Sequence, residues 1–105
     1  MSDAVQTHAD VESRLKVGYA AILSLGVSRL ALFGSVQRGS ARADSDVDLI
    51  VEFQSGQKTF DNLLKLGELL EGALGRSVEL VTPESLSPRL RNLILEEARD
   101  VLRAA

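Results

Sequence analysis

Hydrophobic positions recur along the chain with two different periods, and each period predicts one kind of element. In three stretches the apolar residues lie three and four positions apart, which is the spacing of one face of a helix. These stretches predict helices over residues 3–25, 57–74 and 88–101, and Gly26 and Gly75 are expected to end the first two. The residues expected to face the core are Val11, Leu15, Tyr19, Ile22, Leu23, Phe60, Leu63, Leu64, Leu70, Leu74, Leu90, Leu93, Ile94, Ala98 and Val101.

Shorter apolar runs predict three strands, over residues 29–33, 46–53 and 77–81. The polar stretch 35–43 predicts a turn and a short helix between the first two strands. Because side chains two apart on a strand share a face, the strand 46–53 is expected to have one core face and one polar face. The expected core face carries Val47, Leu49, Val51 and Phe53, and the other carries Asp46, Asp48, Ile50 and Glu52. This order of elements predicts an α/β (α+β) protein with one small sheet flanked by helices.

Composition narrows the function classes. A chain of 105 residues predicts a single domain, 1–105, and the hydrophobic fraction of 45% with 26% charged residues is typical of a folded protein. No apolar run is long enough to cross a bilayer, and the absence of cysteine and of a signal-like N-terminus favours a cytoplasmic location. The net charge of −3 and the few aromatic residues argue against direct nucleic-acid binding.

Asp46 and Asp48 are the first candidates for chemistry. Two carboxylates on one strand face repel each other unless a cation lies between them or both point into water. Carboxylate oxygens, completed by phosphate oxygens, suit Mg²⁺, and paired ions about 4 Å apart can clamp a phosphoryl group. The alternative is that both residues are solvated at a strand edge, which a bare Asp-x-Asp would favour.

Gly34 and Ser35 are the second candidates, because they follow one strand and open the short helix. A glycine lets a phosphate approach the backbone, free amides at a helix start donate to anions, and the serine hydroxyl adds a donor. The alternative is an ordinary turn with a serine cap. The stretch is neither a Walker P-loop nor a dinucleotide fingerprint, because the Lys and the glycine spacing of those motifs are missing.

The combined spacing is more specific than either part. Gly34-Ser35, ten intervening residues and Asp46-x-Asp48 resemble the signature of the DNA polymerase β-like nucleotidyltransferase superfamily, and most closely the minimal nucleotidyltransferase (MNT) family. The matching segments are Phe33-Gly34-Ser35, Arg38-Gly39, Ser45-Asp46-Val47-Asp48-Leu49 and Val78-Glu79-Leu80-Val81-Thr82-Pro83. The resemblance implies a nucleotidyltransferase fold with a small mixed sheet, an N-terminal helix at about 3–25 and a catalytic core over about 28–102.

The resemblance also implies a set of roles. Gly34 and Ser35 would contact the phosphates of ATP, with Arg38 and Ser45 as further nucleotide-binding residues. Asp46 and Asp48 would bind Mg²⁺, with two ions expected. Glu79 takes the place where the family usually has aspartate; it would be the third metal ligand and could activate the acceptor hydroxyl. Alternatively, Arg38 and Glu79 are solvated.

MNT proteins of this size are typically antitoxins that transfer AMP to a tyrosine of a HEPN ribonuclease toxin. The resemblance therefore implies a HEPN-type partner, and a chain of this length is expected to receive its acceptor from a partner protein. Two other functions stay open: an antitoxin that acts by binding alone, and a small-molecule nucleotidyltransferase completed by a helical subunit. His8, Arg42 and Asp44 are expected to be surface residues outside the site.

Overall fold

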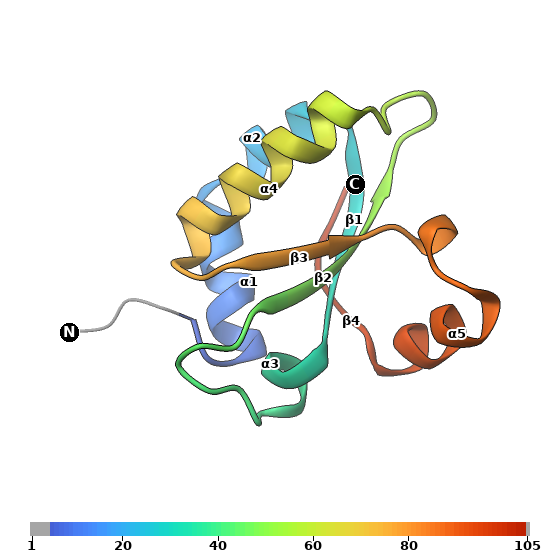
Figure 1. Ribbon diagram of the computed structural model, residues 1–105. Coiled ribbons are helices and arrows are strands. Elements are labelled where there is room, and N and C mark those ends of the chain that lie inside the picture. The colour runs from blue at the N-terminus through green and yellow to red at the C-terminus, as the bar shows by residue number, and fades with distance from the viewer. Residues whose placement is uncertain (1–4, 105) are drawn as a thin grey trace.

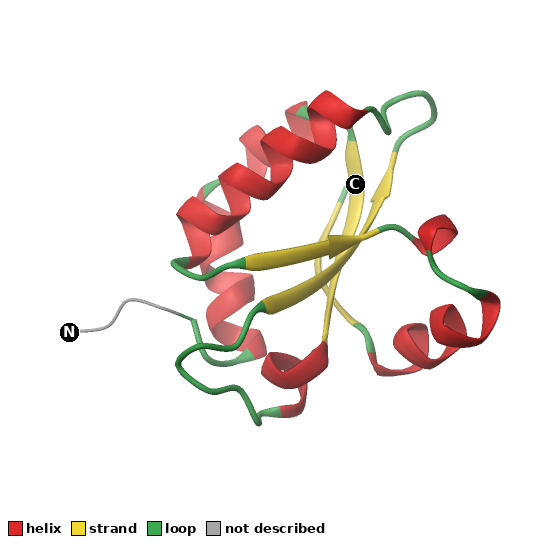
Figure 2. Cartoon of the chain, in the orientation of Figure 1, coloured by secondary structure: helices red, strands yellow, loops and turns green. Residues whose placement is uncertain are grey.

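The computed structural model describes residues 5–104, which form a four-stranded sheet with helices on both sides (Figures 1 and 2). The strands are β1 (Val27–Phe33), β2 (Val47–Phe53), β3 (Val78–Val81) and β4 (Arg99–Arg103), in the spatial order β3-β2-β1-β4. β1 is antiparallel to both β2 and β4, whereas β2 and β3 are parallel. The predicted class, a small mixed sheet flanked by helices, is confirmed.

The helices divide between the two faces of the sheet. They are α1 (His8–Val17), α2 (Tyr19–Ser24), α3 (Gly34–Arg38), α4 (Phe60–Leu74) and α5 (Pro88–Glu97), with a 3₁₀ turn, η1, at Pro83–Ser85. In Figure 1, α1, α2 and α4 lie on one side of the sheet and α5 on the other. Within residues 5–104, every helix is too short or too polar to span a bilayer.

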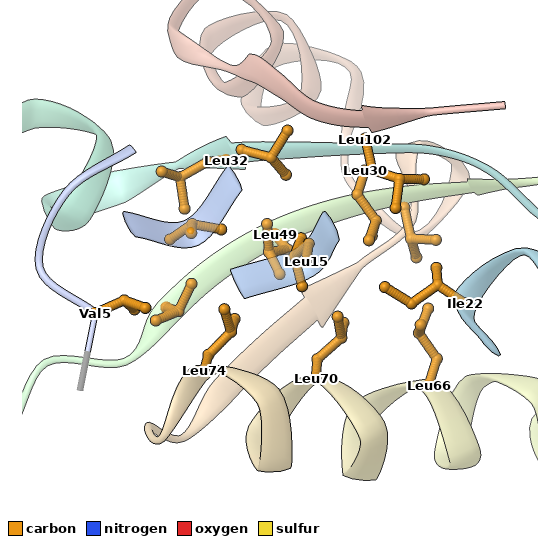
Figure 3. Packing of buried hydrophobic residues seen from close by; sticks show 14 of the residues in the cluster. Val5, Leu15, Ile22, Leu30, Leu32, Leu49, Leu66, Leu70, Leu74 and Leu102 are labelled. Carbon is orange, nitrogen blue, oxygen red and sulfur yellow. The ribbon is translucent and has the colours of Figure 1, made fainter. Parts of the chain in front are cut away.

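The main core lies between the sheet and the helices α1, α2 and α4. Leu66, Leu70 and Leu74 of α4 point from that helix into the core, on the side where Leu49 of β2 lies, and all four side chains are fully buried (Figure 3). Burying one such side chain contributes about 2 kcal/mol. The predicted core face of β2 is confirmed, because Val47, Leu49 and Val51 are buried and Phe53 packs against the same cluster.

The inward face of α4 differs from the prediction at three residues. Phe60 and Leu64 were expected in the core, but 78% and 53% of their surface is exposed. Leu66, which the prediction did not include, occupies the core instead. The apolar residues of this helix fill more than one stripe, and the sheet buries the stripe of residues four apart that ends at Leu74.

The expected helix over 3–25 consists of two helices. Thr7 accepts a hydrogen bond from the Asp10 amide in a capping box that starts α1 at His8, and Gly18 separates α1 from α2. Glycine is a poor helix former, so a break there costs little. Tyr19 was expected to face the core, but its surface is 37% exposed and its hydroxyl donates to the Arg103 carbonyl. Residues 3 and 4 of the predicted helix lie outside the described residues.

The end of the chain departs most from the prediction. The last helix begins at Pro88 as expected but ends at Glu97, and residues 99–103 form β4 beside β1. Ala98 and Val101 are buried as predicted, although not on a helix. Pairing with the free edge of β1 outweighs the helical spacing of this stretch, a long-range effect that the local pattern does not contain.

The outer helix α5 is only partly packed. Ile94 contacts a second, smaller apolar cluster around Ala31 and Ile50, as expected of a core residue. Leu90 and Leu93 were also expected in the core, but 47% and 57% of their surface is exposed. The helical spacing identified an apolar face correctly but could not show that the sheet covers only its C-terminal part.

Candidate active site

Strand register brings the candidate residues from three strands to one end of the sheet. Phe33, the last residue of β1, pairs with Asp48 of β2, and Asp48 pairs with Glu79 of β3. Neighbouring strands lie about 4.8 Å apart, so one row runs from the Phe33–Gly34 bend through Asp48 to Glu79. Asp46 lies just before β2 and is exposed. The structure therefore brings Gly34, Asp48 and Glu79 together.

Gly34 fits against Asp48 because it has no side chain. Its φ of 79° lies in the left-handed region, and a Cβ built on it would overlap the Asp48 carboxylate. An alanine there would meet both backbone strain and a steric clash. The bend after β1 thus places the start of α3 directly beside the Asp48 carboxylate.

Negative charge accumulates around Asp48. The pKa of Asp48 is raised to about 6. The largest cause is its burial, followed by the charge of Glu79, a hydrogen bond between the two carboxyl groups and the charge of Asp46, whereas the charge of Arg38 opposes the rise. Apart from burial, the causes that raise the pKa of Asp48 come from its acidic neighbours Glu79 and Asp46, which Arg38 offsets only in part. A cation bound between Asp48 and Glu79 would relieve the repulsion.

The donor set matches magnesium bound together with phosphates. Across residues 5–104, no three His, Asp or Glu side chains are gathered closely enough to form a ready-made metal cage. Mg²⁺ commonly takes only one or two carboxylates and completes its octahedron with substrate phosphates and water. Asp46, Asp48 and Glu79 offer hard oxygen donors with uncompensated charge, so they fit an ion that arrives with a nucleotide.

Ser35 and Arg38 lie on α3, on the same side as these carboxylates. No side chain or backbone group within residues 5–104 hydrogen-bonds the Ser35 hydroxyl, which is half-buried and remains available to a ligand. Arg38 influences the Asp48 pKa and donates through Nη1 to Glu97 Oε1 at 2.6 Å. Glu97 Oε2 also accepts the Gly34 amide at 2.8 Å. The hydrogen bond from the Gly34 amide, and to a smaller extent the one from Arg38, holds the pKa of Glu97 below its usual range.

Arg76 is a positioning residue that the sequence analysis missed. Its side chain is buried; it donates through Nε to the Val5 carbonyl at 2.6 Å and through Nη1 to the carbonyls of Arg42 and Ser45 at 2.6 and 2.8 Å. It therefore fixes the loop that leads into Asp46. An arginine directly after a glycine helix end is the sequence signal, but its long-range acceptors are not readable from the chain.

The other sequence candidates are placed outside the row of carboxylates. The Ser45 hydroxyl accepts the Arg42 amide at 2.8 Å and so closes a turn within the loop. Arg42 and Asp44 are exposed, in agreement with the expectation that they are surface residues. His8 lies on α1, where its Nε2 is 3.1 Å from the Asp100 carbonyl.

Comparison with known proteins assigns the family. A family model described as "Nucleotidyltransferase domain" matches residues 19–101, which include the bend and all three carboxylates. The chain belongs to the nucleotidyltransferase domain family. It is 42% identical over 81 residues to a provisionally named protein adenylyltransferase of Methanocaldococcus jannaschii, covering 77% of this chain and 86% of the relative. It is 39% identical over 72 residues to protein adenylyltransferase MntA of Thermococcus cleftensis, covering 69% and 72%.

Solved structures place this nucleotidyltransferase among the minimal members of the family. A structure provisionally described as a minimal nucleotidyltransferase aligns with a TM-score of 0.76 at 39% identity, covering 89% of this chain and 94% of the other. A complex of a tri-AMPylated Shewanella oneidensis HEPN toxin with an MNT antitoxin aligns with a TM-score of 0.55 at 20% identity, covering 85% and 72%. The second likeness shows a shared fold. The resemblance drawn from the sequence motif is confirmed.

Proposed function

We propose that this nucleotidyltransferase transfers AMP from ATP, with Mg²⁺, to a tyrosine of a HEPN-type ribonuclease toxin and so acts as an antitoxin. The observation that carries the proposal is the row formed by Gly34, Asp48 and Glu79, which joins a phosphate-binding turn to two carboxylates. Relatives that are 39–42% identical carry the name protein adenylyltransferase. The toxin–antitoxin complex of the same fold supports the choice of partner.

Each site residue has a role in this proposal. The Ser35 amide and hydroxyl bind phosphate oxygens, which the close bend at Gly34 makes possible. Asp46 and Asp48 hold Mg²⁺, with Glu79 as the third ligand. When bound, Mg²⁺ neutralises the charge that develops on the phosphates. Arg38 is a fixed cation within reach of the same phosphates, and Ser45 is the least direct candidate because its hydroxyl is engaged in the loop.

The reaction is a substitution at the α-phosphorus. The acceptor tyrosine oxygen forms a bond to the α-phosphorus as the bond to the bridging oxygen of the β-phosphate breaks. AMP becomes attached to the tyrosine, pyrophosphate leaves, and the phenolic proton passes to a base. Glu79 is the proposed base, because it lies beside Asp48 at the end of the sheet. Catalysis then rests on positioning and charge neutralisation rather than on a covalent enzyme intermediate.

Label transfer tests the proposal. The protein is incubated with Mg²⁺, a HEPN-type ribonuclease from the same organism as the proposed partner, and ATP labelled on either the α- or the γ-phosphate. The α-label should appear on the partner and the γ-label in pyrophosphate. Asp46→Asn should abolish transfer while the fold persists, and Asp44→Asn, a change of the same kind at an exposed loop carboxylate, should not.

The same experiment separates the alternative functions. If the toxin is inhibited but carries no α-label, the chain is an antitoxin that acts by binding alone. This alternative is kept because Glu79 stands where the family usually has aspartate, which could abolish catalysis. If the label appears on a small molecule instead of the partner, the acceptor assignment is wrong. Transfer by Asp46→Asn at the unaltered rate would show that the metal site lies elsewhere.

A further inference from the structure

Glu97 ties the outer helix to the phosphate-binding turn. It is the last residue of α5, and its two carboxylate oxygens take different donors. Oε2 accepts the Gly34 amide at 2.8 Å, and Oε1 accepts Arg38 Nη1 at 2.6 Å. Charge-assisted bonds of this kind are about twice as strong as neutral ones. The side chain of Glu97 is 27% exposed and that of Arg38 is 56% exposed, so the ion pair is shielded from water mainly on the Glu97 side.

One of these two donors, the Arg38 guanidinium, is also a proposed ligand of the incoming triphosphate, and the other, the Gly34 amide, lies directly before the proposed phosphate donor Ser35. A phosphate group, like a carboxylate, presents anionic oxygens to amides and guanidinium groups. Glu97 already satisfies Arg38 and the first amide of α3, and its own negative charge lies at the edge of the proposed phosphate site. The Ser35 hydroxyl beside them has no such partner within the described chain.

We propose that Glu97 is an internal competitor of the nucleotide triphosphate: in the free protein its carboxylate holds Arg38 and the Gly34 amide, and it gives up Arg38 when the nucleotide binds. This inference rests on the proposed function, because it assumes that the triphosphate binds at this turn. It makes Glu97 an affinity-setting residue. The Arg38 bond distinguishes this role from a simple helix cap, since a cap of Gly34 alone would leave Arg38 free.

Nucleotide affinity tests the inference. Glu97→Gln removes the charge and keeps an oxygen that can accept the Gly34 amide, so Arg38 is released to the phosphates. Calorimetric titration with the magnesium complex of AMP-PNP at fixed ionic strength should show at least roughly fivefold tighter binding than in the unaltered protein. Glu96→Gln is the matched control: it removes the same charge one residue earlier, at an exposed side chain, and should change affinity less than about twofold.

The outcomes separate the inference from the proposed function. Equal or weaker binding by Glu97→Gln, with binding by the unaltered protein intact, overturns the competitor role and leaves the proposed function standing. An equal gain in Glu96→Gln also overturns it, because the effect would then be one of general charge. Failure of the unaltered protein and both variants to bind the nucleotide would remove the proposed function and this inference together.

A second measurement needs no variant and so does not depend on the folding of Glu97→Gln. In the unaltered protein, nuclear magnetic resonance can follow the Glu97 side-chain carboxyl carbon and the Arg38 Nε–H group during titration with the same nucleotide. Both signals should shift together and saturate at the same nucleotide concentration, because nucleotide binding breaks the hydrogen bond between Arg38 and Glu97. A carboxyl signal that stays constant while the nucleotide saturates would show that Glu97 does not yield.

Discussion

Replacing Asp48 by asparagine should stabilise the metal-free protein while it destroys transfer. Asp48 is partly buried beside Glu79, and these surroundings raise the pKa of Asp48 from 3.8 to about 6. A rise of that size corresponds to about 3 kcal/mol of unfavourable free energy for the ionised form at neutral pH. Asp48 is partly exposed, and solvent screening reduces the expected effect to about 1 kcal/mol. Asparagine has nearly the same shape and no charge, so it should recover this amount.

The sign of the pH dependence follows from the direction of the shift. The folded state binds the Asp48 proton more tightly than the unfolded state, so this group lowers stability as pH rises from about 4 to about 6. Above that range the penalty is constant, and below it the penalty disappears. The advantage of Asp48→Asn should therefore be full at pH 7 and absent below about pH 4.

Thermal unfolding in the presence of a chelator measures the effect. For a chain of this size, 1 kcal/mol corresponds to a rise in Tm of about 4–8 °C. Asp44→Asn, in the exposed loop before β2, should leave Tm unchanged and serves as the control. A lower Tm for Asp48→Asn at pH 7, or a gain that persists unchanged at pH 3.5, would refute the view that uncompensated charge surrounds Asp48.

Three further changes test other parts of the site. Gly34→Ala should lower the free energy of unfolding by about 2 kcal/mol or more, measured by urea denaturation, because Gly34 has a left-handed φ and faces the Asp48 carboxylate; an unchanged stability would contradict this packing. Arg76→Lys should cost about 2 kcal/mol and slow AMP transfer, because the single lysine nitrogen cannot replace both Nε, which donates to Val5, and Nη1, which donates to the loop; full activity would show that the loop does not need Arg76. Mg²⁺ with AMP-PNP should raise the Tm of the unaltered protein but not that of Asp48→Asn, and a rise of equal size in both would place the metal elsewhere.

The parts of this fold that the sequence predicted are those set by local patterns. The alternation in β2 assigned Val47, Leu49 and Val51 to the core and Asp48 to the opposite face, because a strand has a fixed period of two. Ser87 and Pro88 mark the start of α5 through the same kind of short-range rule. The motif from Gly34 to Asp48 was likewise sufficient to indicate the family.

The parts that were missed depend on contacts between distant segments. β4 forms because β1 offers a free edge, and the apolar spacing around Val101 contains no information about that edge. Arg76 acquires its role from carbonyls more than 30 residues earlier in the chain, and Glu97 from the bend after β1. The separation of 63 positions between Gly34 and Glu97 cannot be bridged by periodicity or by a local motif.

The central claim is that the bend at Gly34–Ser35 and the carboxylates of Asp46, Asp48 and Glu79 surround one metal–triphosphate. Paramagnetic broadening by Mn²⁺ bound with AMP-PNP tests this directly, since the amide signals closest to the ion lose intensity first. The account predicts simultaneous loss at Ser35, Asp48 and Glu79, which lie on three different elements. Loss confined to the acidic residues of α4, with these three signals intact, would contradict it.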